Sequence, residues 1–239
     1  MTAFFAYEVE NPLKEEFFGH AEQGYFVEVG ANDPERWSQT LHLEKLGWTG
    51  ILVEPQPDLA AMLRARRTAK VHVVACSGPE NAGKTMTLHL AGGHSSLDPR
   101  LRVASVRPQG TIDVPLRTLD DILIESDAPS PIDLVAVDVE GHEIEVLRGL
   151  TFTRWRPRLV LVEDHVLDLR LHRFMRSRGY AWVRRTDINS WYVPAEAAWP
   201  IDLWSRVLFF RKYYLGIPFR RGREVLRRLR ARLKAPSPA

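Results

Sequence analysis

Short apolar segments alternate with helix-like segments through most of this chain, and this alternation constrains its fold more than any other feature. The apolar segments have the length of buried strands and cover residues 25–29, 51–53, 71–75, 132–137 and 159–162. Helix-like patterns lie between them, at residues 34–46, 57–63, 142–150 and 167–177. Because such alternation is typical of parallel sheets, the sequence predicts an open, mostly parallel α/β sheet.

Two parts of the chain depart from this alternation. The last two strand-like segments follow each other directly and predict an antiparallel hairpin at the edge of the sheet, at residues 180–185 and 190–193. Residues 78–118 hold strand-like segments at 85–90 and 112–116 without a helix between them, so we expect an excursion from the main sheet. Thr118, with Asp121 three residues later, predicts the capped start of a helix that ends near residue 124.

The chain divides into three parts on these patterns. Residues 1–23 are a leader that we expect to pack on the domain, with a helix predicted over residues 14–20. Residues 24–198 form a single α/β domain, and residues 199–239 form an aromatic and basic tail. Apolar residues recur at helical spacing along the tail, which predicts an amphipathic basic helix.

The net charge of +3 conceals an asymmetry between the domain and its tail. Residues 205–239 contain 11 Lys and Arg and one acidic residue, a net charge of +10, so residues 1–204 carry −7. An acidic domain disfavours nucleic acid as a partner. The tail is expected to lie on an anionic membrane as a peripheral contact, to pack on its own domain or a partner chain, or to bind nucleic acid or another acidic partner.

The expected location is the cytoplasm, with membrane association through residues 199–239 as one alternative. The first residues lack the basic segment of a secretion signal, and no apolar run reaches the length of a membrane-spanning helix. The single cysteine, Cys76, fits a reducing compartment. At a strand end, Cys76 is interpreted as a small buried residue rather than a nucleophile.

Acidic residues stand at the ends of four predicted strands: Glu28, Glu54, Asp138 and Glu163. Ligands of open α/β sheets bind beyond the carboxyl ends of the strands. Four carboxylates around one such edge would form an acidic rim above a ligand crevice. The sequence therefore predicts a site that favours a cationic ligand.

The turn after the first strand is a candidate ligand loop. Gly30 allows close approach of the backbone, but Asn32 occupies the second glycine position of the dinucleotide pattern, which disfavours NAD and FAD. Glu54 follows Gly30 by about 24 residues at the end of the next strand, where an acid accepts the hydroxyls of a ribose. An ordinary tight turn and an exposed acid are the structural alternatives.

A second candidate site follows the strand at residues 132–137. Asp138, Glu140 and Glu143 lie within six residues there, and they are candidates for a general base or for metal ligands, with Glu143 alternatively stabilising a first helical turn. His165, beside Glu163 and Asp164, is a second candidate base or a structural histidine. The loop around residues 94–96 either lines the mouth of a substrate site or is simply polar.

Taken together, these residues resemble the FkbM-type family of S-adenosylmethionine-dependent methyltransferases over roughly residues 24–194. The Asp138-Val139-Glu140-Gly141 segment is a specific part of the resemblance. The resemblance is carried by residues 26–32 (FVEVGAN), 50–55 (GILVEP), 94–97 (HSSL), 132–143 (IDLVAVDVEGHE), 146–149 (VLRG) and 161–163 (LVE).

The resemblance implies a Rossmann-like domain that binds S-adenosylmethionine. In it the 30–33 loop would approach the methionine part, Glu54 would bind the ribose and Ser77 would lie near the adenine. The expected cofactor contacts are Glu28, Gly30, Ala31, Asn32, Asp33, Glu54, Pro55, Ser77 and Asp138. The expected catalytic residues are Asp138, Glu140 and His165, and no residue is assigned to a metal. Asp33-Pro34 replaces the x-Gly of many members, which makes this turn stiffer and more acidic.

The reaction that the resemblance implies is O-methylation of a hydroxyl group on a small molecule or glycan, such as a sugar, a polyketide or another natural product. Two alternatives stay open at the level of sequence. One is a non-catalytic, methyltransferase-like binding module that the tail tethers to a membrane or an acidic partner. The other is a metal-dependent enzyme that uses Asp138, Glu140 and His165. Sequence does not show whether these three residues converge.

Overall fold

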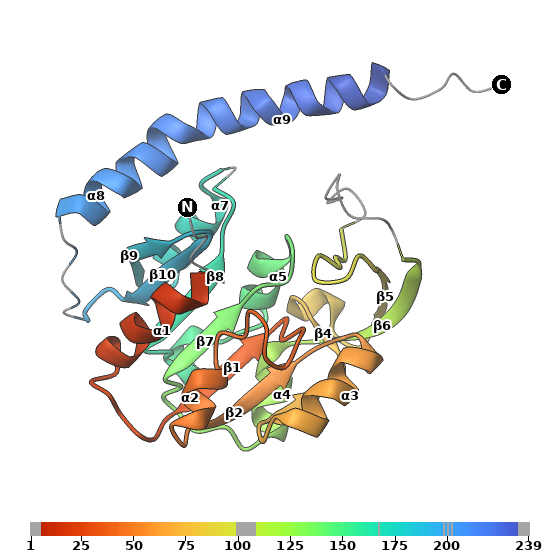
Figure 1. The fold of residues 1–239 in the computed structure, drawn as a ribbon, viewed down its shortest axis with the longest axis vertical. Coiled ribbons are helices and arrows are strands. Elements are labelled where there is room, and N and C mark those ends of the chain that lie inside the picture. The colour runs from red at the N-terminus through yellow and green to blue at the C-terminus, as the bar shows by residue number, and fades with distance from the viewer. Residues whose placement is uncertain are drawn as a thin grey trace.

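A seven-stranded sheet forms the centre of the protein in a computed structural model, which describes residues 6–98, 109–166, 168–197, 199, 201 and 203–233 (Figure 1). The strand order is β3 (Lys70–His72), β2 (Thr49–Val53), β1 (Tyr25–Val29), β7 (Leu134–Val137), β8 (Leu159–Glu163), β10 (Asn189–Pro194) and β9 (Tyr180–Thr186). The first five strands are parallel, and β10 runs antiparallel to both of its neighbours. The predicted mostly parallel, Rossmann-like α/β sheet with an antiparallel edge hairpin is therefore confirmed.

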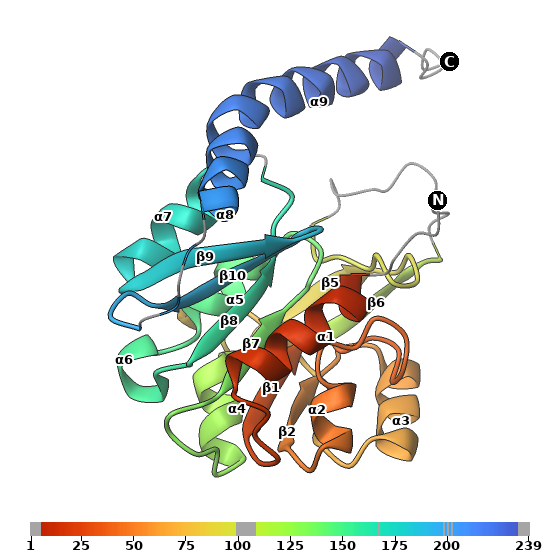
Figure 2. The ribbon, with the colours of Figure 1, turned by 60° about the vertical axis from the view of Figure 1, so that its left-hand side comes forward.

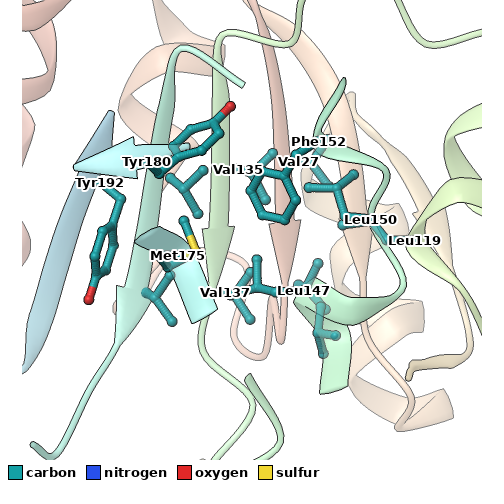
Figure 3. Packing of buried hydrophobic residues seen from close by; sticks show 14 of the residues in the cluster. Val27, Leu119, Val135, Val137, Leu147, Leu150, Phe152, Met175, Tyr180 and Tyr192 are labelled. Carbon is teal, nitrogen blue, oxygen red and sulfur yellow. The ribbon is translucent and has the colours of Figure 1, made fainter. Parts of the chain in front are cut away.

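Helices cover both faces of this sheet, because successive strand residues point to opposite sides. Phe26 and Leu52 pack on one side in a cluster that includes residues of α2 (Leu41–Lys45) and α3 (Pro57–Arg66). The opposite cluster, part of which Figure 3 shows, joins Val27 and Val135 to the remaining helices of the domain. Those helices are α4 (Leu119–Glu125), α5 (Glu143–Arg148), α6 (Phe152–Trp155) and α7 (Arg170–Ser177). The predicted cap of α4 is confirmed, since Thr118 and Asp121 form a capping box.

The excursion is a separate three-stranded sheet beside the main one. It consists of β4 (Ala75–Cys76), β6 (Thr111–Arg117) and β5 (Thr85–His89), with a short 3₁₀ helix, η1 (Pro79–Asn81), after β4. The prediction of one strand over residues 71–75 was wrong. β3 ends at His72, and Ala75 pairs with Leu116 in the second sheet. The chain changes sheets here, which an apolar run alone does not reveal.

The helix predicted over residues 34–46 was also largely wrong, since only Leu41–Lys45 is helical. The carboxylate of Asp33 accepts hydrogen bonds from the backbone N–H groups of Glu35 and Arg36. The buried carboxylate of Glu28 accepts hydrogen bonds from Ser38, Gln39 and Thr40. Such bonds from side chain to backbone compete with helix formation. They hold this segment as a series of turns.

The leader helix α1 covers Ala6–Phe17 rather than residues 14–20. Two charged residues on this helix are fully buried against the domain. Glu10 accepts hydrogen bonds from Thr186 and Asn189, and Lys14 donates to the carbonyl oxygen of Gln39 at 2.6 Å. Burial lowers the pKa of Lys14 to about 8. A search for apolar periodicity misses a face whose buried residues are charged.

The tail forms a long helical segment, as predicted. It contains α8 (Leu203–Phe209), a π-helical stretch η2 (Phe210–Leu215) and α9 (Gly216–Leu233). Tyr213 and Ile217 pack into the core cluster of the α7 side, whereas the far end of α9 extends away from the domain in both views (Figures 1 and 2). Among the described residues, no helix combines the length and the hydropathy that crossing a membrane requires.

Candidate active site

A cavity of about 770 Å³ opens at the carboxyl ends of β1, β2, β7 and β8. Its size lies within the range of small-molecule sites, roughly 300–1,000 Å³. The residues that line it include many that sequence reasoning selected, namely Gly30, Ala31, Asn32, Glu54, Pro55, Asp138 and Glu140. The edge of the sheet that sequence indicated as a ligand crevice is therefore hollow.

The turn after β1 is held by the backbones of the two neighbouring strands. The N–H groups of Gly30 and Ala31 donate to the carbonyl oxygen of Val53, at 2.9 and 3.1 Å. Gly30 has a φ of +86°, and a Cβ added there would lie 1.8 Å from the carbonyl oxygen of Asp138. Only glycine fits, because the ends of β1 and β7 meet at this point.

Glu54 combines burial with unused hydrogen-bonding capacity. Its two carboxylate oxygens accept backbone N–H groups of Asn32 and Gln56, each at 2.9 Å, and its side chain lines the cavity. Burial raises the pKa of Glu54, and these hydrogen bonds act against that increase. The side-chain amide of Gln56 donates a third, longer bond at 3.4 Å. A carboxylate has about four lone-pair sites, so capacity remains for a hydroxyl group of a ligand.

Asp138 and Glu163 bring two more acidic side chains to the cavity, from the ends of β7 and β8. Enclosure by the cavity walls, together with the negative charges of Glu140 and Glu28, raises the pKa of Asp138 to about 6. Burial and the neighbouring Asp138 charge raise the pKa of Glu163 well above its usual range. This pair favours a ligand that carries positive charge.

Glu140 connects this acidic cluster to the excursion. It lies in a tight turn with a φ of +53°. Its carboxylate is 2.7 Å from Nδ1 of His94, and its carbonyl oxygen accepts a hydrogen bond from the Ser96 hydroxyl at 2.7 Å. His94 and Ser95 line the cavity, which agrees with the interpretation of this loop as part of a substrate mouth.

Some of the residues expected to contact the cofactor or to act in catalysis do not line the cavity. The carboxylate of Glu28 is directed to the loop before α2, and that of Asp33 caps its own turn. Ser77 is buried, and its hydroxyl contacts His142 and Asn81. His165 is half-exposed beside Glu163, with Nε2 3.4 Å from the carboxylate. Any ligand contact of these residues stays a prediction.

Sequence reasoning did not assign several cavity residues to the site. An acidic residue at the end of a buried strand indicates a site, but the sequence predicts Glu163 only as part of the acidic rim. The others lie on loops whose convergence depends on the tertiary fold; they are Trp37, Gln39, Gln56, His142 and residues 187–189. Cys76 also lines the cavity, and burial raises the pKa of its thiol to about 12, so it is not a nucleophile.

Part of the chain is similar to a named methyltransferase. The hexuronic acid methyltransferase AglP of Haloferax volcanii is 33% identical over 82 residues, which are 33% of this chain and 34% of that protein. The chain thus matches about a third of the length of this curated relative. The similarity therefore relates one part of this chain to one part of that protein, and it does not extend to the whole of either.

A family profile covers much more of the chain. The methyltransferase FkbM domain matches residues 28–181, which run from the end of β1 to the start of β9 and include the excursion. All the carboxylates that line the cavity at strand ends fall within this match. The chain belongs to the family of FkbM methyltransferase domains.

Proposed function

We propose that this protein is an S-adenosylmethionine-dependent O-methyltransferase that acts on a hydroxyl group of a sugar or a related natural product. The observation that carries the proposal is the convergence of Glu54, Asp138 and Glu163 on one cavity beside the glycine turn of β1. Membership of the FkbM methyltransferase family supports the same conclusion.

The β1–β2 side of the cavity fits an adenosyl cofactor. Residues 30–32 offer a backbone that approaches closely, and the remaining hydrogen-bonding capacity of Glu54 suits a ribose hydroxyl. The acidic lining favours the positive sulfonium of S-adenosylmethionine, which supplies an electrophilic methyl group when bound. No Lys or Arg other than Arg36 lines the cavity among the described residues.

The β7–β8 side of the cavity is where the acceptor would bind. Methylation of a hydroxyl group releases its proton, and the Asp138 carboxylate lies at the cavity surface, where it can accept that proton. His94 and Ser95 cover this side from the excursion. These residues therefore orient the acceptor, and alignment is the main contribution that we expect from the protein.

A sugar is the acceptor class that we favour among the natural products with free hydroxyls. The similarity to a protein named as a hexuronic acid methyltransferase supports this choice. The cavity is polar on the acceptor side, where carboxylate, imidazole and hydroxyl groups can bond to several sugar hydroxyls at once. An apolar polyketide would leave these groups without partners.

Calorimetric titration of the full chain with S-adenosylmethionine tests the proposal. We expect saturable binding that Glu54→Gln weakens by at least about tenfold, because the hydroxyl hydrogen bonds lose a charged acceptor. Asp58→Asn is the matched control, since Asp58 is an exposed acid in the first turn of the next helix. Absence of binding to the unmodified chain, or equal weakening by both variants, would contradict the proposal.

A further inference from the structure

We propose that Glu140, Glu163 and His165 bind a divalent metal ion at the edge of the cavity, which Glu140 and Glu163 line and His165 adjoins. One ligand atom from each of the three residues lies within 4.8 Å of the other two. In one of these pairs, Nε2 of His165 lies 3.4 Å from Oε1 of Glu163. Two carboxylates and an imidazole are a donor set that suits divalent cations such as Mn²⁺.

The elements that carry these residues explain why they meet. Glu163 ends β8, and His165 follows two residues later, so both side chains leave the same strand end. Glu140 comes from the turn that follows the neighbouring strand β7, which pairs in parallel with β8. The carboxyl ends of adjacent parallel strands thus bring the ligands together without help from a remote segment.

Glu163 supplies an independent observation, because part of its carboxylate is buried and unsatisfied. The residue is 5% exposed, it lines the cavity, and its Oε2 atom has no hydrogen-bond partner. A buried carboxylate is normally paired with a charge or coordinates a metal. In the described part of the chain, no Lys or Arg forms an ion pair with Glu163 or Glu140. A cation would satisfy this oxygen.

The surrounding charges point to an ion with more than one positive charge. Asp138 lies beside Glu163, and Glu140 completes a group of three neighbouring acids. His94 contacts Glu140 at 2.7 Å and is the other basic side chain close to this group. A divalent ion is attracted to such a group of acids more strongly than a monovalent ion at the same distance, and it reduces the repulsion among them.

The consequence for catalysis rests on the proposed function. Three protein ligands leave positions open on the ion, and an acceptor hydroxyl can occupy one of them. A coordinated hydroxyl loses its proton more readily, because the ion stabilises the alkoxide. The ion would therefore select acceptors with two neighbouring oxygen atoms, as sugars and sugar acids have. Binding of the ion itself does not depend on this step.

Titration of the full-length chain with Mn²⁺ tests the metal site, with the electron paramagnetic resonance signal of the free ion as the readout. We expect stoichiometric loss of that signal, and at least about tenfold weaker binding in Glu163→Gln. Asp187→Asn is the matched control, because Asp187 lines the same cavity outside the three-residue cluster. His165→Ala is a second variant, which removes a half-exposed side chain, and its free energy of unfolding is measured alongside.

The outcomes separate this inference from the proposed function. Weaker Mn²⁺ binding in both Glu163→Gln and His165→Ala, with no change in Asp187→Asn, supports the site. Absence of Mn²⁺ binding by a chain that still binds S-adenosylmethionine overturns the metal site and leaves the methyltransferase proposal intact. Mn²⁺ binding that neither variant weakens also overturns it.

The outer face of the tail carries a second, independent inference: we infer that it docks on an anionic membrane surface. The inner face of the tail already packs on the domain. The ring centroids of Phe209 and Trp182 are 4.7 Å apart. The Tyr213 hydroxyl donates a hydrogen bond of 2.5 Å to the buried carboxylate of Asp164. The outer face is apolar and open to solvent. Its residues include Leu203, Trp204, Val207, Phe210, Tyr214 and Phe219, each at least 46% exposed.

The charge of the tail identifies the kind of surface that this face fits. Residues 205–239 carry a net charge of +10, and the exposed side chains of Arg206 and Arg211 flank the apolar face. Exposed aromatic side chains next to basic ones are typical of helices that lie in a membrane interface. Each basic residue near an anionic surface contributes about 1 kcal/mol. A second acidic domain of this chain is the competing occupant.

Vesicle co-sedimentation of the full chain tests this docking, with phosphatidylglycerol–phosphatidylcholine vesicles compared with phosphatidylcholine alone. We expect binding only to the anionic vesicles, and at least about tenfold weaker binding in the double variant Trp204→Ser, Phe219→Ser. Ile124→Ser, which removes an exposed apolar side chain elsewhere, is the control. Equal vesicle binding by the double variant and the original chain overturns the inference. It is also overturned if the original chain binds no vesicles and forms a dimer that dissociates in the double variant.

Discussion

The cavity contains buried acidic side chains, whereas the tail carries exposed basic ones. In the cavity, acidic side chains such as Glu54 and Glu163 are buried, and backbone N–H groups or neighbouring side chains fix Glu54 in place. In the tail, the basic side chains of Arg206 and Arg211 are exposed and can change conformation. Buried charge is suited to fixing the position of one ligand, whereas exposed charge is suited to a broad surface. The net charge of the whole chain describes neither region.

The two regions nevertheless meet at one strand end. Glu163 faces the cavity, and the next residue, Asp164, faces the tail, where it accepts hydrogen bonds from Tyr213 and Ser190. Arg220 of α9 donates to the carbonyl oxygen of Val166 at 2.9 Å, which strengthens the same connection. The comparison therefore predicts that changes of acidic side chains in the cavity affect turnover, while changes at the tail contact affect the free energy of unfolding.

The largest effect is expected when Asp138 in the cavity loses its charge. Asp138→Asn preserves the shape of the side chain but removes the group that we propose as the acceptor of the hydroxyl proton. General base catalysis contributes roughly 10²–10⁴-fold, so turnover should fall by that factor. Product formation and calorimetric binding of S-adenosylmethionine are measured on the same protein. Turnover at the original level would show that Asp138 is not the base.

The next effect concerns the close contact between the two strand ends below the cavity. Gly30→Ala would place a Cβ 1.8 Å from the carbonyl oxygen of Asp138, and the residue has a φ of +86°. We expect the free energy of unfolding to fall by at least about 3 kcal/mol. Gly83→Ala is the matched control, with a φ of +76° and no atom within 4 Å, and it should cost about 1 kcal/mol. Urea unfolding measures both, and equal losses would contradict the steric argument.

A smaller effect is expected at the contact between tail and domain. Tyr213→Phe removes the hydroxyl that bonds to the buried Asp164, so the free energy of unfolding should fall by about 1–3 kcal/mol. Tyr214→Phe changes the adjacent exposed tyrosine and should stay within about 0.5 kcal/mol of the original protein. Affinity for S-adenosylmethionine should be the same in both variants. A selective loss of that affinity in Tyr213→Phe would show that the two regions are coupled.

The last prediction needs no substitution, because it uses a chemical probe of the cavity wall. Because burial raises the pKa of the Cys76 thiol to about 12, the native protein should react with iodoacetamide at pH 8 at least about a hundredfold more slowly than the unfolded protein. Mass spectrometry follows the reaction at this single cysteine. Similar rates in both states would mean that this wall is open to solvent.

The sequence predicted the sheet and the acidic edge because both depend on local pattern. Apolar runs identified β1, β2, β7 and β8, and an acid at the end of a buried strand is visible without any tertiary information. The loop before α2 was not predictable in this way. Its conformation depends on hydrogen bonds to Glu28, and a carboxylate buried among hydroxyl groups looks like any other strand residue in the sequence.

The contact between tail and domain was even less predictable from local sequence patterns. Tyr213 and Asp164 are 49 residues apart, and nothing in either local sequence identifies the other as its partner. The grouping of Glu163 with Glu140 and His165 likewise depends on parallel pairing of β7 and β8 in a particular register. Local sequence gave the chemical types of these residues, whereas the tertiary fold decided which of them meet.

The contact between Gly30 and the carbonyl group of Asp138 has a consequence for how such a domain can diversify. It joins the strand that carries the glycine turn to the strand that leads to Asp138, and it does so through main-chain atoms. The relative placement of the proposed cofactor side and the proposed acceptor side therefore depends on the backbone rather than on the surrounding side chains. The excursion is a separate sheet, so a substitution there would alter the proposed acceptor side and leave this main-chain contact in place.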